Sequence, residues 1–216
     1  MAMYGKVEYW DERYRWSGEN GSTYDWYANY DDTRSVLCGS FHPDSSSFKL
    51  EGEEHRSVVT RENCRVLILG CGNSTFGEEM RLDGWKGEIV NVDFSSVVID
   101  QMKEKYDEEH DQNDARFVAP KMKWVCADIT EGLPFENESF DLIVCKGTFD
   151  AMLCSGGSPT NVYTLVEECV RVLSPGSGCF FLVTTGTPEN RRLYLEHDGY
   201  LDYYWEKEPA IVMVSR

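Results

Sequence analysis

The sequence has no long uninterrupted apolar stretch. Its longest runs, such as Val66 to Leu69 and Phe180 to Val183, have the length of a β-strand, whereas a membrane-spanning helix needs roughly 20 apolar residues. Residues 1–8 also lack the apolar core of a secretory signal. We therefore expect a soluble, cytoplasmic protein that does not insert into a membrane.

A metal-binding or disulfide pattern is missing as well. The 8 cysteines are scattered along the 216 residues without a CxxC pair or a His/Cys cluster, the arrangements that indicate structural zinc sites. Several of them, including Cys126, Cys145 and Cys179, stand in apolar strand-like segments, where a reduced thiol packs as a small hydrophobe. The sequence thus predicts free thiols and no metal site.

Basic residues are scarce. There are 21 Lys and Arg against 38 Asp and Glu, which gives a net charge of −17. Such a surface repels nucleic acid phosphates and anionic lipid, and it attracts basic partners at low salt. Acidity also simply keeps a protein soluble, but its sign argues against a nucleic acid or membrane partner and favours a basic protein substrate.

The chain is expected to form one domain, 1–216, because its length suits a single hydrophobic core. Residues 1–38 are rich in Tyr and Trp and predict a packed segment, with a helical turn near 9–14 and a helix over 24–38. Residues 39–63 indicate an irregular surface insertion. Residues 64–216 have the regular pattern of a Rossmann-like core.

Apolar strands and amphipathic helices alternate through that core. Strands are predicted at 65–69, 88–92, 123–127, 140–145, 179–183, 201–205 and 210–214, with helices at 75–83, 95–106, 163–173 and 189–195. This alternation predicts a mostly parallel α/β sheet of seven strands with helices on both faces. In such sheets, ligands bind at the carboxyl ends of the strands.

The loop after the first strand carries Gly70 and Gly72. Glycines there let backbone N–H groups approach a ligand closely, next to the partial positive charge of a helix start. A dinucleotide fingerprint would have a third glycine at position 75, where this chain has Thr75. The missing glycine disfavours a nicotinamide oxidoreductase, although a tight structural turn explains the pair of glycines equally well.

Two acids follow at the ends of the next strands. Asp93, after the second strand, is placed to accept the ribose hydroxyls of an adenosine, as in many nucleotide sites. Asp128, after the third strand, is placed to meet the adenine amino group, although an isolated Asp there is often only a turn or helix cap. Together with Gly70 and Gly72, these strand ends predict an S-adenosylmethionine pocket.

The sequence resembles the seven-strand (class I) S-adenosylmethionine-dependent methyltransferases over nearly its whole length. Within them it is similar to a eukaryotic group of lysine methyltransferases acting on translation elongation factor 1-alpha, one of which is related to endothelin-converting enzyme 2. The residues that carry the resemblance are Glu8–Tyr14 (EYWDERY), Tyr24–Tyr27 (YDWY), Leu69–Ser74 (LGCGNS), Val92–Val98 (VDFSSVV), Ser139–Asp141 (SFD) and Lys146–Ala151 (KGTFDA). The insertion at 39–63 and Phe94, where a relative has Tyr, depart from the group.

The resemblance implies a cofactor site and an N-terminal aromatic lid. It places the lid residues over the cofactor, the glycine loop at its methionine end, the next strand end at its ribose, and the third strand end at its adenine. The residues concerned are Trp10, Tyr14 and Trp26 in the lid, Gly70, Gly72 and Asn73 in the loop, then Asp93, Phe94, Asp128, Ile129 and Lys146. Core packing explains the lid aromatics equally well. A lysine after an apolar strand, however, needs a partner for its ammonium, such as the cofactor carboxylate.

A lysine acceptor must be neutral to attack the methyl group, although its ordinary pKa is about 10.4. An aromatic channel favours the neutral amine, and Trp26, Tyr27 and Phe149 are candidates for building it. Asp150 is a candidate for orienting the incoming ammonium or for a structural cap, because a free carboxylate beside the amine would stabilise the ammonium. The catalytic group is otherwise undetermined.

Three alternatives remain open at this point. A small-molecule methyltransferase of the same fold would label metabolites from radiolabelled cofactor. A non-catalytic adenosylmethionine-binding module would bind the cofactor without transferring its methyl group. A nicotinamide oxidoreductase would bind NADH tightly.

Overall fold

The order of the strands in the sheet determines where a ligand-binding crevice forms. The computed structural model describes residues 3–40, 59–108, 122–154 and 159–195. In these residues one parallel sheet has the order β3-β2-β1-β4-β5. The strands are β1 (Val66–Leu69), β2 (Ile89–Asp93), β3 (Lys123–Cys126), β4 (Leu142–Lys146) and β5 (Cys179–Val183). Strand order reverses between β1 and β4, so the loops that follow them diverge and leave a crevice.

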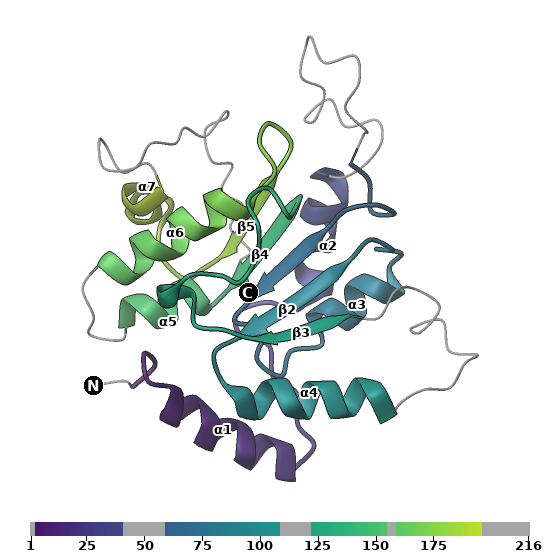
Figure 1. Ribbon diagram of the computed structural model, residues 1–216, viewed down its shortest axis with the longest axis vertical. Coiled ribbons are helices and arrows are strands. Elements are labelled where there is room, and N and C mark those ends of the chain that lie inside the picture. The colour runs from purple at the N-terminus through teal and green to yellow at the C-terminus, as the bar shows by residue number, and fades with distance from the viewer. Residues whose placement is uncertain (1–2, 41–58, 109–121, 155–158, 196–216) are drawn as a thin grey trace.

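Helices cover both faces of the sheet (Figure 1). The apolar core on one face includes residues of α1 (Val7–Glu19), α2 (Tyr30–Ser40), α3 (Phe76–Leu82) and α4 (Ser96–Glu108). The core on the other face includes residues of α5 (Thr148–Cys154), α6 (Thr160–Val172) and α7 (Pro188–Leu195), with the short 3-10 helix η3 (Ile129–Glu131). Along the described ranges, no helix has both the length and the apolar content to cross a membrane.

The Rossmann-like α/β class predicted from the sequence is confirmed, and five of the predicted strands are present. The two closing strands predicted at 201–205 and 210–214 lie outside the described residues, as do residues 41–58 of the expected insertion. Helix α5 was not predicted. Its 7 residues make barely two turns, too few for a periodic pattern to emerge.

The second N-terminal helix begins at Tyr30, and the prediction that it begins at residue 24 is wrong. Asn29 and Asp32 form a reciprocal capping box: the Asp32 N–H donates to Asn29 Oδ1 at 2.9 Å, and the Asn29 N–H donates to Asp32 Oδ2 at 3.0 Å. Tyr27, with φ of 66°, is in the left-handed region and cannot continue a helix. Residues 20–29 therefore form a loop that reaches the strand ends.

Helix α1 runs over residues 7–19 and is longer than the predicted single turn. It lies beside α4 (Figure 1), where Gln101 Nε2 donates to the Tyr14 carbonyl at 3.1 Å. Ser95 Oγ donates to Asp11 Oδ1 at 2.5 Å at the start of α4. These contacts hold the aromatic N-terminal segment over one end of the sheet.

Candidate functional site

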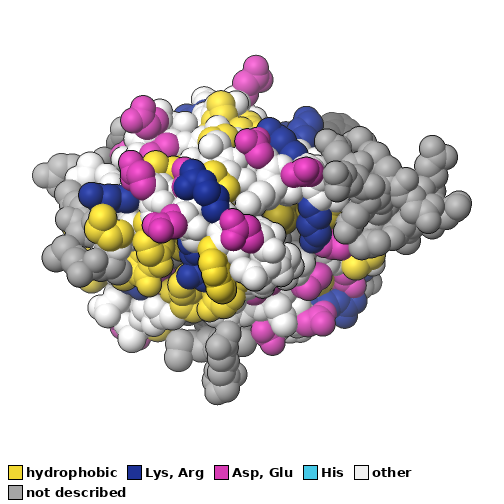
Figure 2. Space-filling view, turned by 90° about the horizontal axis from the view of Figure 1, so that it is seen from below, with side chains coloured by type: hydrophobic (Ala, Val, Ile, Leu, Met, Phe, Trp, Pro, Cys, Tyr) yellow, Lys and Arg dark blue, Asp and Glu magenta, His cyan; other side chains and the backbone are white. Residues whose placement is uncertain are grey.

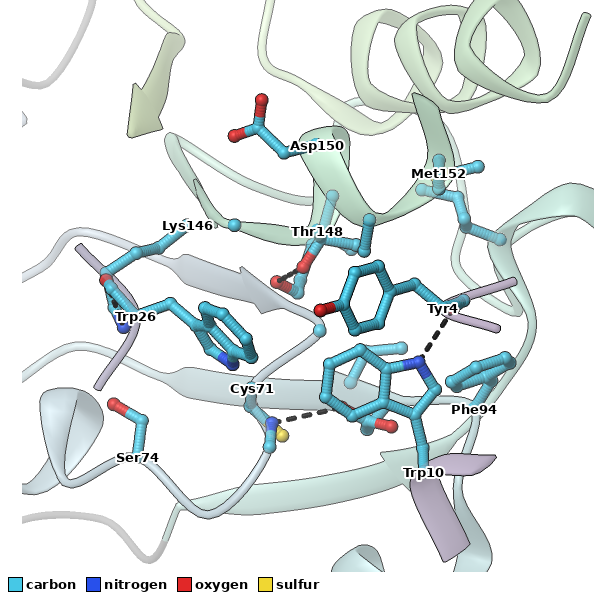
Figure 3. A pocket seen from close by; sticks show the side chains of 18 of the residues that line it. Tyr4, Trp10, Trp26, Cys71, Ser74, Phe94, Lys146, Thr148, Asp150 and Met152 are labelled. Carbon is cyan, nitrogen blue, oxygen red and sulfur yellow. Dashed lines mark hydrogen bonds between the residues drawn. The ribbon is translucent and has the colours of Figure 1, made fainter. Parts of the chain in front are cut away.

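A pocket opens at the carboxyl ends of β1, β2 and β4, under the N-terminal segment (Figure 3). Its floor comes from Leu69–Ser74 after β1 and from residues 146–148 at the end of β4. One side comes from Asp93 and Phe94, with residues 127–130 beyond them. The rings of Tyr4, Trp10 and Trp26 project over this floor from the lid. The pocket thus occupies the crevice where strand order reverses.

The glycine loop is where three parts of the chain meet. Gly70 and Gly72 have φ values of 59° and 52°, in the region that favours glycine. A Cβ on Gly70 would lie 2.0 Å from Thr148 Oγ1, and a Cβ on Gly72 would lie 2.8 Å from the Tyr14 hydroxyl. Thr148 Oγ1 also donates to the Leu69 carbonyl at 3.0 Å. Both glycines are therefore required by packing as well as by backbone conformation.

Asp93 holds the same loop from the end of β2. Its Oδ2 accepts the Gly72 N–H at 3.0 Å and its Oδ1 accepts the Ser95 N–H at 3.0 Å. Burial raises the pKa of the Asp93 carboxyl to about 6, against the opposing effect of these backbone donors. Each carboxylate oxygen has more than one acceptor site, so the group retains acceptor capacity toward the pocket.

Asp128 is a helix cap. Its exposed side chain accepts the Thr130 N–H at 2.9 Å and the Thr130 hydroxyl at 2.7 Å, at the start of η3. This is the capping role that the sequence left open for an acid at this strand end. The neighbouring side chains are apolar, since Ile129 is buried and Phe94 is half-buried in the same wall.

Lys146 ends β4, and its ammonium is paired within the protein. Nζ donates to Asp25 Oδ1 at 2.7 Å, and the Lys146 side chain is only 8% exposed. Asp25 also accepts a short hydrogen bond from the Ser74 hydroxyl. The sequence indicated that this lysine needs a partner, but it did not identify Asp25 of the lid.

The lid aromatics pack against one another above the loop. Trp10 and Tyr14 are buried and stacked with ring centroids 5.8 Å apart, and Trp26 meets Trp10 edge-on at 6.2 Å. Trp10 Nε1 donates to the Tyr4 carbonyl at 2.7 Å. Asn73 of the glycine loop donates from Nδ2 to the Ser22 carbonyl at 2.7 Å. The lid is thus bound to the strand ends at several points.

Residues 67–181 match the family model described as "Methyltransferase domain". This chain belongs to the methyltransferase family. It is 30% identical over 211 residues to mouse "EEF1A lysine methyltransferase 4", covering 94% of this chain and 69% of that protein. It is also 33% identical over 175 residues to human "eEF1A lysine and N-terminal methyltransferase", covering 80% of this chain and 20% of that protein.

Among solved structures, an S-adenosylmethionine-dependent methyltransferase from Methanosarcina mazei is similar, with a TM-score of 0.48 and 22% identity. The match covers 62% of this chain and 58% of that one. The methyltransferase family implies S-adenosylmethionine as the cofactor. The pocket is chemically suited to this cofactor. The Asp93 carboxylate lies beside the glycine loop, and Phe94 and Ile129 form an apolar wall that can flank a purine.

On the side of the pocket away from Asp93, this methyltransferase has Tyr27 and Asp150. Asp150 Oδ1 pairs with Arg191 Nη2 at 2.5 Å and accepts the Thr184 hydroxyl at 2.8 Å. The Arg191 and Asp150 side chains are 13% and 7% exposed. Burial, and next the Asp150 charge, raise the pKa of the Tyr27 hydroxyl. The Asp150 carboxylate is therefore engaged in an ion pair and hydrogen bonds and is not a free base.

Phe149 does not lie with the other predicted site residues. It is fully buried in the core of the α5–α7 face, where its ring meets Tyr194 edge-on at 5.8 Å. It is absent from the pocket wall, so the expectation that it builds an acceptor channel does not fit its placement. The other predicted residues line the pocket: Trp10, Tyr14, Trp26, Tyr27, Gly70, Gly72, Asn73, Asp93, Phe94, Asp128, Ile129, Lys146 and Asp150.

Sequence reasoning missed Tyr4, Arg13 and Thr148, which also line the pocket of the methyltransferase. Arg13 could have been predicted as a pocket residue, because it lies in the EYWDERY segment between Trp10 and Tyr14. Thr148 gave no signal, since its role depends on the close approach of two loops that are far apart in sequence. Within the described ranges, no group of three His, Cys, Asp or Glu side chains is placed to hold a metal ion.

Proposed function

We propose that this chain is a protein-lysine N-methyltransferase that acts on a basic protein of the elongation factor 1-alpha type. The support comes from relatives with that activity in their names, of which the mouse protein aligns over 94% of the chain and the human protein over 80%. Both alignments extend beyond the matched methyltransferase domain. The net charge of −17 favours encounter with a basic protein.

In this proposal the pocket residues hold S-adenosylmethionine in a defined order. Asp93 accepts the ribose hydroxyls, the apolar wall of Phe94 and Ile129 flanks the adenine, and the backbone beside Asp128 meets its edge. Gly70, Gly72 and Asn73 lie along the methionine end, near Lys146. The lid rings of Trp10, Tyr14 and Trp26 close over the cofactor and exclude water.

The bound cofactor supplies a methyl group on a sulfonium, which an amine displaces in line. The protein contributes by orienting the amine and the methyl group and by excluding water from the site. The acceptor lysine must lose its proton first, and an unpaired carboxylate beside it would hold that proton. Because Asp150 is ion-paired with Arg191, its charge is offset where the acceptor arrives. We assign Asp150 to orienting the acceptor and shaping the pocket, with Tyr27 beside it.

The electrostatic attraction would come from the net charge of the molecule, since the described residues on the face of α1 and α4 form no single acidic patch (Figure 2). Figure 2 faces the side of α1 and α4, where Asp and Glu side chains are interspersed with Lys, Arg and hydrophobic groups. A distributed negative charge steers basic proteins over a Debye length of about 8–10 Å and is screened by salt. We also propose that the protein works in the cytoplasm, which cell fractionation tests directly.

The proposal is tested by incubating the purified protein with cofactor labelled in its methyl group and with cell extract. Mass spectrometry should find the label on a lysine of a basic protein, and purified elongation factor 1-alpha should accept it. The Asp93→Ala variant is the control and should transfer little label. Label in the metabolite fraction alone would support a small-molecule methyltransferase. Cofactor binding by calorimetry without any transfer would support a non-catalytic module.

A further inference from the structure

Arg13 occupies an aromatic corner of the pocket. Its guanidinium carbon lies 5.2 Å from the Tyr24 ring centroid, 5.3 Å from that of Trp26 and 6.0 Å from that of Trp10. The residue is half-buried and lines the pocket, and Tyr24 is 49% exposed. Arg13 therefore lies at the edge of the lid, where cation–π contacts with three rings hold its guanidinium.

The other charged side chains at the pocket are paired or lie elsewhere. The second cation of the pocket wall, Lys146, forms an ion pair with Asp25, and Asp150 forms one with Arg191. Asp93 and Asp128 follow β2 and β3, where their carboxylates accept backbone N–H groups. Arg13 forms no ion pair within the described ranges, so it is the uncompensated charge on the aromatic side.

Tyrosine side chains make up much of the aromatic side of the pocket. Burial raises the pKa of the Tyr14 hydroxyl well above its ordinary value, and burial also raises that of Tyr27. Tyr4, Tyr24 and Cys154 also line the pocket. Arg13 is therefore a cation among aromatic rings in a chain whose net charge is −17.

We propose that Arg13 is a fixed cation that favours the neutral, nucleophilic form of the amine acceptor as it enters along the aromatic side. The inference rests on the proposed lysine methyltransferase function. A nearby positive charge destabilises an ammonium relative to the amine, and the partly desolvated site strengthens that effect. The rings of Trp10, Tyr24 and Trp26 keep the guanidinium in place. Arg13 is thus a positioning residue that acts through the protonation state of the substrate.

The test is the pH dependence of kcat, which reports groups in the enzyme–substrate complex. The variants are Arg13→Met, which removes the charge, and Arg13→Lys, which keeps it. The matched control is Arg15→Met on the same helix, because Arg15 is exposed and 3.8 Å from Asp11. Acceptor protein and cofactor are kept saturating, and each variant is first checked for cofactor affinity by calorimetry and for a cooperative thermal transition.

In Arg13→Met the rise of kcat with pH should move to higher pH by about 0.5–1 unit, the order expected for one charge several ångströms away. The profiles of Arg13→Lys and Arg15→Met should overlay that of the native protein, and all three variants should retain cofactor affinity. If Arg13→Met does not fold, Arg13→Gln carries the same expectation.

Several results would overturn the inference. A uniform fall in kcat without a change in the pH profile would leave Arg13 a packing role only. A loss of cofactor affinity in Arg13→Met that Arg13→Lys restores would assign Arg13 to the cofactor carboxylate instead. If the native protein methylates no lysine, the proposed function fails before any variant is measured, and this inference fails with it.

Discussion

Asp93 has two tasks, and the substitution Asp93→Asn should expose both. The carboxylate accepts the Gly72 and Ser95 backbone N–H groups, and the proposed cofactor site asks it to accept ribose hydroxyls as well. An asparagine has nearly the same size but presents one NH2 donor in place of an acceptor oxygen. One of the two backbone N–H groups is then left facing a donor in a buried site.

The expected cost follows from these contacts. A hydrogen bond to a charged acceptor contributes about 1.5–3 kcal/mol, and the variant loses one such bond within the protein. For a domain of this size that loss alone corresponds to a fall in melting temperature of roughly 3–12 °C, which near pH 7 is opposed by the removal of a buried carboxylate whose ionisation itself lowers stability. Losing the charged acceptor for the ribose should weaken S-adenosylmethionine binding at least about tenfold. An alanine would cost more, because both N–H groups lose their acceptor.

The pH dependence has a defined sign. Burial raises the pKa of the Asp93 carboxyl from 3.8 to about 6, so between these values the folded protein binds more protons than the unfolded chain. Its free energy of unfolding should therefore fall as pH rises through this window, by about 3 kcal/mol from this group. Ribose hydroxyls donate to the ionised form, so cofactor affinity should fall as pH drops below 6, with proton release on binding.

Calorimetry in buffers of different ionisation enthalpy, combined with thermal denaturation at several pH values, measures all of these quantities. The Asp93→Asn variant should lose the proton release, since its amide does not titrate. An unchanged affinity for S-adenosylmethionine in a variant with a lowered melting temperature would refute the ribose assignment and leave Asp93 as the residue that shapes the glycine loop. A melting temperature with the same pH dependence in Asp93→Asn as in the native protein would refute the titration assigned to Asp93.

Three further substitutions probe the contacts around the site. Lys146→Met should lower the free energy of unfolding by about 3–5 kcal/mol because it leaves Asp25 unpaired, and adding Asp25→Asn should recover part of this loss in denaturant titrations. Gly70→Ala should lower the free energy of unfolding by more than about 1–2 kcal/mol, because the Gly70 backbone is left-handed and an added Cβ would lie 2.0 Å from Thr148 Oγ1. A variant with native stability would show that the two loops can move apart without cost. Asn29→Ala should cost about 0.5–2 kcal/mol by removing the cap of α2, with cofactor affinity retained, and a loss of affinity would mean that the start of α2 shapes the pocket.

The sheet and the glycine loop were predictable because their signals are local. Runs such as Val66 to Leu69 are apolar throughout and are buried throughout, as parallel central strands must be. The boundary of α2 was also readable in principle, because Asn29 and Asp32 form a capping box within four residues. The prediction began the helix too early because it followed the aromatic residues and not the cap.

The rest depended on contacts that no short segment carries. Lys146 and Asp25 are far apart in sequence, and the polar surroundings of Asp25 give no sign that it becomes half-buried. Phe149 was predicted to build the acceptor channel and Asp150 to orient the acceptor or to act as a structural cap, and the two residues are adjacent in the KGTFDA segment. In the helix α5, neighbouring side chains point about 100° apart, so Phe149 enters the core while Asp150 lies at the pocket. Because helix α5 was not predicted, nothing in the sequence placed Phe149 and Asp150 on different faces.

The lid and the strand ends behave as one unit, and this affects how variants of the site must be interpreted. Asp25 accepts from both Lys146 and Ser74, and Asn73 donates to the Ser22 carbonyl, so the loops expected to hold the cofactor also hold the lid. A change at Lys146 therefore loosens the lid even if its ammonium never contacts the cofactor. Single substitutions confound the two effects. A double-mutant cycle between Lys146 and Asp25, with cofactor affinity measured at each corner, separates them. If the affinity loss from Lys146→Met disappears when Asp25 is already Asn, the lysine serves the lid; if it persists in full, the lysine serves the cofactor directly.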